Sequence, residues 1–347
     1  MPDNYWWNPK TILSYNALFN FIVGAMGCGK THGLKTWFIK QFLQDGGQFI
    51  YIRRTDKELE KSAKKFTNDL GFEFPDHMFR KMGDELHVVE INHETGEPKE
   101  GCKWRVCGYF AYLTGARIQK STSYHFVKNI LFDEFIIPKG SVRGYMEDEV
   151  DAFLELYESI ARMRDVRCFF CANALTMINP YFLYFNITQK PTSKNGIMRV
   201  KKDLVFELCR TEAYREAKKE TRFGQLVRGT DFEKYAIEND FVWDTTGHIE
   251  KKTGNCFYEF SLQIGNEWVA VYRNNMLGKV WISEDVDLNR PLKYGVKVND
   301  KFNTMIFKNR RQYVKIDDLF TNFQMGNVYF ETQKCKTLVW DMFTKLL

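Results

Sequence analysis

Eight residues near the start of the chain have the types and the spacing of a phosphate-binding loop. The run Gly24-Ala25-Met26-Gly27-Cys28-Gly29-Lys30-Thr31 matches the pattern G-x-x-x-x-G-K-[ST]. In such a loop, backbone N–H groups and a helix N-terminus point at phosphates, the lysine reaches the β and γ oxygens, and the hydroxyl binds Mg²⁺. We therefore predict a site for ATP and Mg²⁺, with contacts from Gly24, Gly27, Cys28, Gly29, Lys30, Thr31 and His32.

Two consecutive acids follow an apolar run further along the chain. Asp133 and Glu134 come directly after Asn129–Phe132. We expect Asp133 to hold Mg²⁺ together with Thr31, and Glu134 to activate the attacking water. A strand end that faces solvent is the alternative interpretation, but the phosphate loop upstream favours ATP hydrolysis.

Three further polar residues are candidates for the same chemistry. Arg162 is our choice for a cation that stabilises charge on the γ-phosphate, inserted into the neighbouring subunit of a ring; a solvated helix end is the alternative. Lys120 lies in a polar loop before the acidic strand, and either covers the nucleotide or is an ordinary surface lysine. Asn173 ends an apolar run and suits a polar sensor of the γ-phosphate.

These residues need a sheet whose strands end at a common edge. Buried strands are predicted at Leu18–Val23, Gln48–Arg54, Asn129–Phe132 and Arg167–Asn173, with helices after the glycine loop, at Asp56–Asp69 and at Glu147–Arg164. This alternation predicts an α/β fold with a parallel sheet flanked by helices. Because such sheets bind ligands at the carboxyl ends of their strands, Arg53 and Arg54 are expected near the nucleotide or near DNA.

The pattern changes beyond residue 198. The segment Arg199–Arg228 holds nine basic and five acidic residues in a pattern that we interpret as largely helical. Three later segments alternate with period two and predict an antiparallel meander, and an amphipathic helix from about Gln333 to Leu347 ends the chain. We therefore expect a P-loop domain at 1–210, a helical linker at 211–240 and a separate α+β domain at 241–347. The three strands of the meander are predicted at Asn255–Ile264, Glu267–Tyr272 and Lys279–Ile282.

Composition limits the class of protein. With 44% hydrophobic and 16% aromatic residues the chain is expected to fold, and a net charge of +6 is compatible with nucleic acid without requiring it. No stretch approaches about 20 uninterrupted apolar residues, so no membrane span is predicted. The start of the chain lacks the apolar core of a secretory leader, which favours reduced cysteines in a cytoplasm. Cys168 and Cys171 have C-x-x-C spacing inside an apolar run, and we interpret them as strand residues.

Several of these segments resemble the genome-packaging ATPase of phi-29-like podoviruses, a family related to large terminases. The resemblance implies an ASCE/RecA-like P-loop fold and a ring, expected to be a pentamer, on the portal of an empty prohead. It implies that ATP drives double-stranded DNA inward and that a packaging RNA tethers the ring. It also implies action in the cytoplasm of the infected bacterial host and absence from the mature virion. The resemblance is carried by Phe49–Arg54, Leu131–Ile136, Val166–Cys168, Asn173-Ala174, Asn179–Leu183 and Thr221–Leu226.

The same resemblance implies site roles. It implies Lys30 and Thr31 for phosphate and Mg²⁺, Asp133 and Glu134 for Mg²⁺ and catalysis, and Arg162 for the arginine finger. One residue fewer than the family pattern separates the arginines from Val166-Arg167-Cys168, so Arg164 competes for the finger role.

Large terminases carry an RNase H-like nuclease with an acidic cluster and two metals in their C-terminal domain. Here the first strand of the meander offers Glu259, with Glu284, Asp285 and Asp287 after the third, but no Asp in the middle of the first strand. We expect an RNase H-like domain without nuclease activity that binds nucleic acid, or else a solvated basic face. The basic residues concerned are Lys293, Lys297, Lys301, Lys308, Arg310, Arg311 and Lys315.

Other functions fit the sequence less well. A small-molecule kinase would need an acceptor motif, and a helicase would need its own signature motifs; neither is found in the chain. A terminase-like protein with an active nuclease would need the missing acid, and a purely nucleotide-gated assembly protein would not need Asp133 and Glu134 in sequence. The segment Lys61–Lys65 is a candidate for DNA contact in a pore, with a charged helix face as the alternative.

Overall fold

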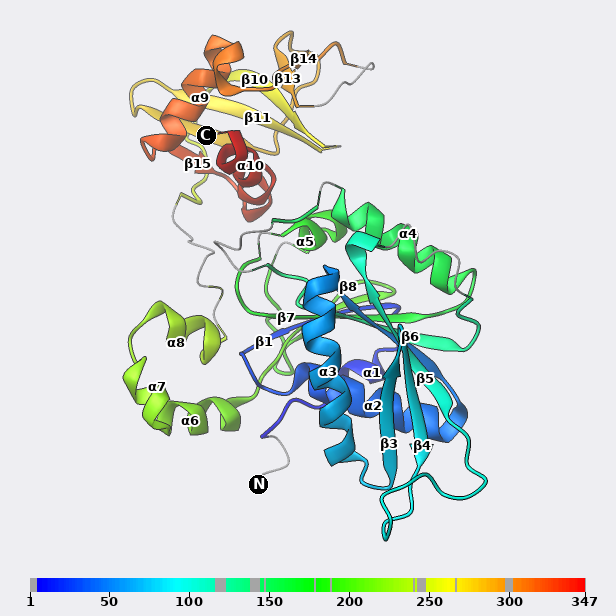
Figure 1. Ribbon diagram of the computed structural model, residues 1–347. Coiled ribbons are helices and arrows are strands. Elements are labelled where there is room, and N and C mark those ends of the chain that lie inside the picture. The colour runs from blue at the N-terminus through cyan, green and yellow to red at the C-terminus, as the bar shows by residue number, and fades with distance from the viewer. Residues whose placement is uncertain are drawn as a thin grey trace. The chain divides into compact units, whose positions relative to one another are not determined.

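The chain folds into two compact units in the computed structural model (Figure 1), each built around its own sheet. The first unit comprises residues 1–176 with 190–243, and the second comprises residues 177–189 with 244–347. The structure describes residues 5–115, 123–137, 144–146, 148–177, 179–187, 189–239, 241, 248–265, 267–296 and 302–346.

The first unit contains a nine-stranded sheet in the order β3-β4-β5-β2-β6-β7-β1-β9-β8. The six strands from β5 to β9 in this order run parallel, and the strands at both edges are antiparallel to their neighbours. The predicted α/β fold with a parallel sheet is therefore confirmed. The strands are β1 Phe19–Gly24, β2 Gln48–Arg53, β3 His77–Met82, β4 Glu85–Glu90, β5 Arg105–Tyr112, β6 Val127–Asp133, β7 Arg167–Asn173, β8 Ile197–Lys201 and β9 Leu204–Leu208.

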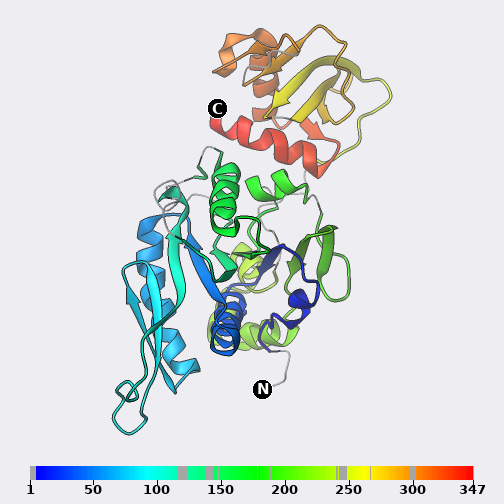
Figure 2. The same ribbon diagram turned by 90° about the vertical axis from the view of Figure 1, so that its right-hand side faces the viewer.

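Helices cover both faces of this sheet (Figures 1 and 2). On one face, Phe38 of α2 packs against Phe49 of β2, with ring centroids 5.2 Å apart, and Phe66 of α3 packs beside them. On the other face, Phe153 of α4 stacks on Phe132 of β6 at 5.7 Å. These buried rings fix the strands that carry the polar residues. The helices are α1 Lys10–Ser14, α2 Lys30–Asp45, α3 Asp56–Glu73, α4 Glu149–Ala161, α6 Glu212–Glu220, α7 Arg222–Leu226 and α8 Asp231–Ala236, with a 3-10 turn at Leu113–Gly115.

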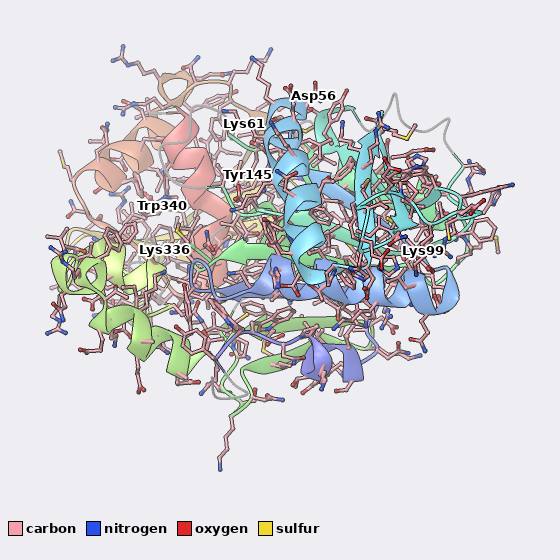
Figure 3. All side chains as sticks on the ribbon, turned by 60° about the horizontal axis from the view of Figure 1, so that its bottom comes forward. Asp56, Lys61, Lys99, Tyr145, Lys336 and Trp340 are labelled. Atoms are coloured by element: carbon pink, nitrogen blue, oxygen red, sulfur yellow. The ribbon has the colours of Figure 1, made fainter. Side chains whose placement is uncertain are left out.

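Helix α3 begins as its sequence predicts and presents charge outward. Thr55 caps it by accepting a hydrogen bond from the backbone N–H of Glu58, and acids occupy its first turn. Asp56 and Lys61 mark this part of the helix in Figure 3. Lys61, Lys64 and Lys65 are exposed while Ala63 and Phe66 are buried, so the lysines lie on the outer face of the helix.

The segment that begins at Arg199 is not helical at first, and this part of the prediction is wrong. Residues 197–208 form the antiparallel pair β8–β9, and β9 lies beside the P-loop strand β1. Leu204, Val205 and Phe206 are buried there, because a strand in the middle of a covered sheet needs apolar residues on both faces. Lys201, Lys202 and Asp203 come directly before β9, and their charges outweighed its short apolar run in the composition of the segment. Helices begin only at Glu212.

The second unit contains a six-stranded sheet in the order β14-β13-β10-β11-β12-β15. The predicted meander is confirmed as β10, β11 and β12, and the terminal helix is confirmed as α10. One face packs against α9 and α10, with Phe260, Phe320 and Phe343 fully buried. The elements are α5 Pro180–Phe185, β10 Phe257–Ile264, β11 Glu267–Asn274, β12 Lys279–Ser283, β13 Lys293–Gly295, β14 Met305–Ile306, a 3-10 turn at Arg310–Gln312, α9 Val314–Gln324, β15 Val328–Phe330 and α10 Gln333–Leu346.

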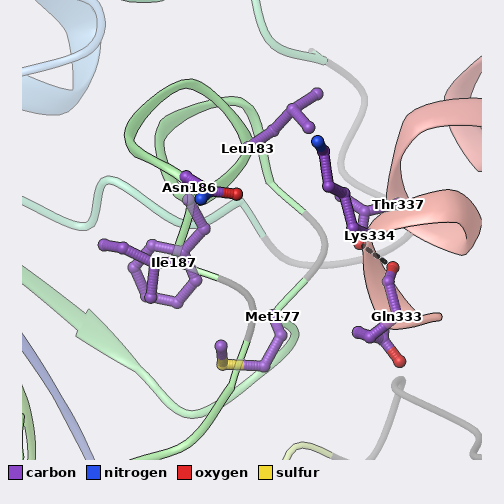
Figure 4. Close-up of a pocket in the computed structure, with 8 residues that line it drawn as sticks. Met177, Leu183, Asn186, Ile187, Gln333, Lys334 and Thr337 are labelled. Carbon is purple, nitrogen blue, oxygen red and sulfur yellow. Dashed lines mark hydrogen bonds between the residues drawn. The ribbon is translucent and has the colours of Figure 1, made fainter. Parts of the chain in front are cut away.

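A small pocket lies between α5 and α10 of this unit, lined by Met177, Leu183, Asn186 and Lys334 among others (Figure 4). Its volume of about 10 Å³ is room for about one water molecule. The pocket is therefore too small for a nucleotide.

Two further features of the described residues are relevant to function. None of the helices described is both long and apolar enough to cross a bilayer. All eight cysteines are free thiols, and Cys168 and Cys171 are buried in β7 as strand residues.

Candidate active site

The glycine loop connects β1 to α2, as the sequence predicts. Gly27 and Gly29 have φ angles of +79° and +98°, a left-handed conformation that glycine adopts without a steric penalty. Gly24 is constrained by space instead, because a Cβ there would lie 2.8 Å from the side chain of Cys209. The loop delivers the N-terminus of α2, a helix of 16 residues, to the carboxyl edge of the sheet. Backbone donors for an anion are thus in place.

Lys30 extends along this loop and reaches the next strand. It is buried, and its Nζ donates to the carbonyl oxygens of Ala25 at 2.8 Å and Gly24 at 3.1 Å. It also lies 3.4 Å from Oδ1 of Asn173, at the end of β7. Burial opposes the charge, but nearby groups, Cys28 foremost, raise the pKa of Lys30 above its usual value. The lysine is therefore charged and adjacent to the predicted sensor Asn173.

Asp133 meets Thr31 at the end of β6. Its Oδ1 accepts a hydrogen bond from the Thr31 hydroxyl at 2.9 Å, and its Oδ2 accepts one from the Tyr51 hydroxyl at 3.0 Å. Burial raises the pKa of the Asp133 carboxyl, and the Arg53 guanidinium offsets part of this effect. A threonine hydroxyl beside a carboxylate is an oxygen donor set of the kind that Mg²⁺ prefers. The residues present therefore fit the predicted metal.

Glu134 has an unusual backbone conformation for its residue type. Its φ angle is +57°, in the left-handed region that non-glycine residues rarely occupy. Its side chain is 59% exposed, and one of its oxygens lies 2.5 Å from the guanidinium of Arg53, which is itself buried. The strained turn points the Glu134 carboxylate out of the sheet edge, beside Asp133.

Arg54 holds the strained turn in place. Its guanidinium donates to the carbonyl oxygens of Glu134 at 3.2 Å and Phe135 at 2.7 Å, and it makes three further hydrogen bonds to the carboxylate of Glu149 on α4. Arg53 and Arg54 thus both lie beside Asp133 and Glu134 at the carboxyl edge of the sheet. Their specific partners could not be read from sequence, because these depend on β2 lying next to β6.

The two candidate finger arginines have different surroundings. Both belong to the turn between α4 and β7, where Arg162 and Met163 have φ angles of +43° and +66°. Arg162 is exposed, and its Nε donates to the carbonyl oxygen of Ser159 at 3.2 Å. The guanidinium of Arg164 instead donates to five carbonyl oxygens, those of Tyr124, His125, Val127, Ile160 and Ala161. Arg164 is therefore committed to holding the turn, and Arg162 is presented to solvent.

The other residues predicted for the site do not all contact the phosphate-binding loop. The His32 imidazole turns away from the loop and lies 3.2 Å from Glu73 of α3. Cys28 is buried, and the neighbouring Cys209 thiol is the main cause that lowers its pKa to about 6. Lys120 lies outside the described residues, as do Lys297 and Lys301 of the basic set.

In the second unit, the predicted acids are paired with cations. Glu259 contacts Arg273 at 3.1 Å and Lys315 at 3.2 Å, and Asp285 contacts Lys252 at 3.2 Å. Glu284 and Asp287 have Lys334 and Arg290 as partners. No group of three or more potential metal-ligating side chains occurs within the described ranges. Lys315 and Arg310 of the basic set are likewise engaged by acids.

Comparison with known proteins gives a consistent result. A family model described as Podovirus DNA encapsidation protein (Gp16) matches residues 1–347. The DNA packaging protein of Bacillus phage B103 is 31% identical over 337 residues, which cover 96% of this chain and 99% of that protein. A chain of the bacteriophage Phi-29 viral genome packaging motor assembly is similar in structure, with a TM-score of 0.73 at 28% identity, over 99% of this chain and 100% of that one. The N-terminal domain of the DNA packaging ATPase from bacteriophage phi29 is 33% identical with a TM-score of 0.50, over 60% of this chain and 98% of that one.

Proposed function

The chain belongs to the podovirus DNA encapsidation protein (Gp16) family, and we propose that it hydrolyses ATP to drive double-stranded viral DNA into a preformed prohead. One observation supports this most strongly. Lys30, Thr31, Asp133 and Asn173 meet at one edge of the first sheet, through contacts of 2.9 Å between Thr31 and Asp133 and 3.4 Å between Lys30 and Asn173. Phosphate binding, metal binding and γ-phosphate sensing need these residue types side by side.

Each side chain at this edge has a role in the proposed hydrolysis. Lys30 binds the β and γ phosphates, and Thr31 and Asp133 hold Mg²⁺, which when bound offsets the negative charge of the phosphates. Glu134 orients the attacking water and accepts its proton while the bond from the γ-phosphorus to the bridging oxygen breaks, which releases ADP and phosphate. Arg53 holds the Glu134 carboxylate near Asp133, and Arg54 fixes the peptide behind it.

Arg162 completes the site of a neighbouring subunit in this proposal. Arg164 ties the turn to the carbonyl oxygen of Val127, at the start of β6, whereas Asp133 ends the same strand. At about 3.3 Å per residue, the seven residues of β6 span about 20 Å. An arginine side chain cannot cross that distance, so an Arg162 finger would have to act on a second copy of the chain, as it does in the proposed ring.

We assign the rest of the chain by its charge and by the relatives. Residues 1–210 act as the ATPase domain, residues 211–240 as a helical linker, and residues 241–347 as an RNase H-like domain that binds nucleic acid without cutting it. The proposed ring is a pentamer on the prohead portal, tethered by a packaging RNA, in the cytoplasm of the infected host and absent from the mature virion. It grips DNA through phosphates, so its affinity falls steeply with salt.

The pairing of the acids with cations in the second unit supports the proposal that this domain has no nuclease activity. Glu259 and Asp285 face cations where a two-metal nuclease needs free carboxylates. DNA cutting dependent on Mg²⁺ or Mn²⁺, and lost on substitution of Glu259 or Asp285, would restore the nuclease alternative.

Steady-state ATP hydrolysis, with and without double-stranded DNA and across protein concentration, tests the proposed function. We expect DNA to stimulate turnover and the rate per subunit to rise with concentration, because each site needs an arginine from a neighbour. A rate indifferent to both variables would replace the packaging motor by a self-contained P-loop enzyme.

A further inference from the structure

An aromatic cluster covers one side of the glycine loop. The Trp6 side chain lies 3.7 Å from the position of a Cβ on Gly29, and the Tyr214 hydroxyl lies 2.8 Å from that of a Cβ on Gly27. The two rings are 5.2 Å apart, and Tyr5 contacts both. Residues 5–6 and Tyr214 of α6 therefore meet on the loop, and Figure 1 shows the start of the described chain near α6.

The order of the strands places this cluster on the opposite side of β1 from the residues proposed for the γ-phosphate. Asp133 and Asn173 end β6 and β7, which lie on one side of β1, and Glu134 directly follows β6. The other side of β1 is occupied by β9, and α6 follows β9 in the chain. With the γ-phosphate directed toward β6 and β7, the rest of the nucleotide extends toward the opposite side, where Trp6 and Tyr214 lie.

The cluster is fixed to the loop by hydrogen bonds of its own. The backbone N–H of Trp7 donates to the Cys28 carbonyl at 2.9 Å, and its indole donates to the buried carboxyl of Glu207 at 2.8 Å. The Tyr214 hydroxyl and the Lys218 ammonium both donate to the carbonyl of Met26, at 3.0 Å and 2.8 Å. The rings are thus held in position from two directions, while Trp6 itself is 50% exposed.

We propose that Trp6 and Tyr214 form the stacking surface for the purine base of the nucleotide bound at the glycine loop. The proposal rests on the ATP site proposed above and adds the part of that site that holds the base. A half-exposed indole with a fixed neighbour offers a flat face to an aromatic ring without having to be ordered on binding. Glu207 and Lys218 are positioning residues, because they hold the indole segment and the loop rather than the ligand.

Calorimetric titration with two ligands tests the proposal. Mg-ATP carries the base, and inorganic tripolyphosphate with Mg²⁺ carries the phosphates alone. We expect Trp6→Ala to raise the Kd of ATP by about 5- to 100-fold and to leave the Kd of tripolyphosphate unchanged. Trp6→Phe keeps an aromatic face and should restore most of the affinity for ATP. Phe72→Ala removes another ring, 88% exposed on α3, and should change neither constant.

The Lys30→Ala variant separates the ATP site from the base surface. It should lose both ligands, and if it binds both as the wild type does, the ATP site itself is wrong and the base surface with it. If Lys30→Ala loses both ligands but Trp6→Ala binds ATP normally, the ATP site stands and the base surface is overturned. The base surface is also overturned if Trp6→Ala weakens ATP and tripolyphosphate by equal factors, since that result means a distorted loop.

Discussion

Two acids, Asp133 at the end of β6 and Glu259 within β10, have different surroundings in the two sheets. Asp133 of the first sheet receives hydrogen bonds from two neutral hydroxyls, those of Thr31 and Tyr51, and the Arg53 guanidinium lies 3.5 Å from its Oδ2. Glu259 of the second sheet lies against two cations, Arg273 and Lys315. A hydroxyl leaves a carboxylate with its charge and with lone pairs for a metal, whereas two cations at 3.1 Å and 3.2 Å offset the charge of Glu259. For Asp133 and Glu259, the number of cations and their distances distinguish the carboxylate that fits a metal from the one that is paired.

The same contrast occurs between two arginines of a single turn. Arg164 uses its guanidinium to hold five carbonyl oxygens, and Arg162, two residues earlier, is exposed. Arg164 stabilises the turn, whereas the exposed guanidinium of Arg162 can act on a group outside it. Substitution of Arg164 should therefore change the stability of the protein, and substitution of Arg162 should change its ATP turnover.

Arg162→Ala should have the largest effect. We expect kcat to fall by about 10³- to 10⁵-fold with ATP binding retained, since a finger stabilises charge that develops only in the transition state. ATP turnover and calorimetric binding measure the two quantities. The matched change, Arg164→Ala, should lower the unfolding temperature instead. Normal turnover in the Arg162 variant, or lost turnover at unchanged stability in the Arg164 variant, would exchange the two roles.

Glu134→Gln should have the next largest effect. Loss of the proton acceptor is expected to reduce kcat by about 10²- to 10⁴-fold, with little change in the Kd for ATP. Glu259→Gln in the second sheet is the matched control, and its turnover should equal that of the wild type. Equal losses in both variants would mean that the two sheets do not differ in the way described.

Glu207→Gln probes an acid of the first sheet that has no ion-pair partner among the described residues. Burial raises the pKa of Glu207 to about 8 from a usual 4.5. The folded protein thus keeps a proton that the unfolded chain releases, so this group lowers stability as pH rises from about 4.5 to about 8. At pH 8 the variant should be more stable than the wild type by about 4 kcal/mol, and near pH 4.5 the two should be equal. Denaturant unfolding at both pH values measures this, with exposed Glu212→Gln as the control, and equal stability at pH 8 would contradict it.

Arg273→Ala should have the smallest effect. It leaves the Glu259 side chain, which is 7% exposed, with Lys315 as its remaining cation. We expect a loss of about 2 kcal/mol in unfolding free energy and unchanged ATP turnover. Thermal unfolding and turnover are both measured. DNA cutting that appears with Mg²⁺ in this variant would show that the cation alone had suppressed a nuclease site.

Sequence reasoning succeeded where contacts are set by neighbouring residues. The glycine loop, the acids after β6 and the meander follow from local patterns, and the loop meets Asp133 because both end parallel strands of one sheet. It failed over residues 199–208, where two strands were expected to be helical. The charged turn dominated the composition there, and the apolar run of β9 is short.

The partners that tune the site depend on contacts distant in sequence. Trp6 and Tyr214 are 208 positions apart and meet only because β9 lies beside β1. The structural role of Arg164 requires the carbonyl oxygens at the start of β6 to face its turn. The orientation of His32 toward Glu73 likewise depends on where α3 packs. None of these placements leaves a periodic signal in the chain.

The position of Arg162 at the far end of β6 from Asp133 has a consequence for counting. Under the proposed assembly, each chain carries the two halves of different sites. An open row of n chains then contains n − 1 complete sites, and only closure into a ring supplies the last one. In a closed ring, one chain without Arg162 inactivates a single ATP site, that of one neighbour, and the other ATP sites remain complete. The ATP turnover of rings mixed from wild-type and Arg162→Ala chains in known ratios would therefore report the number of subunit interfaces in the ring.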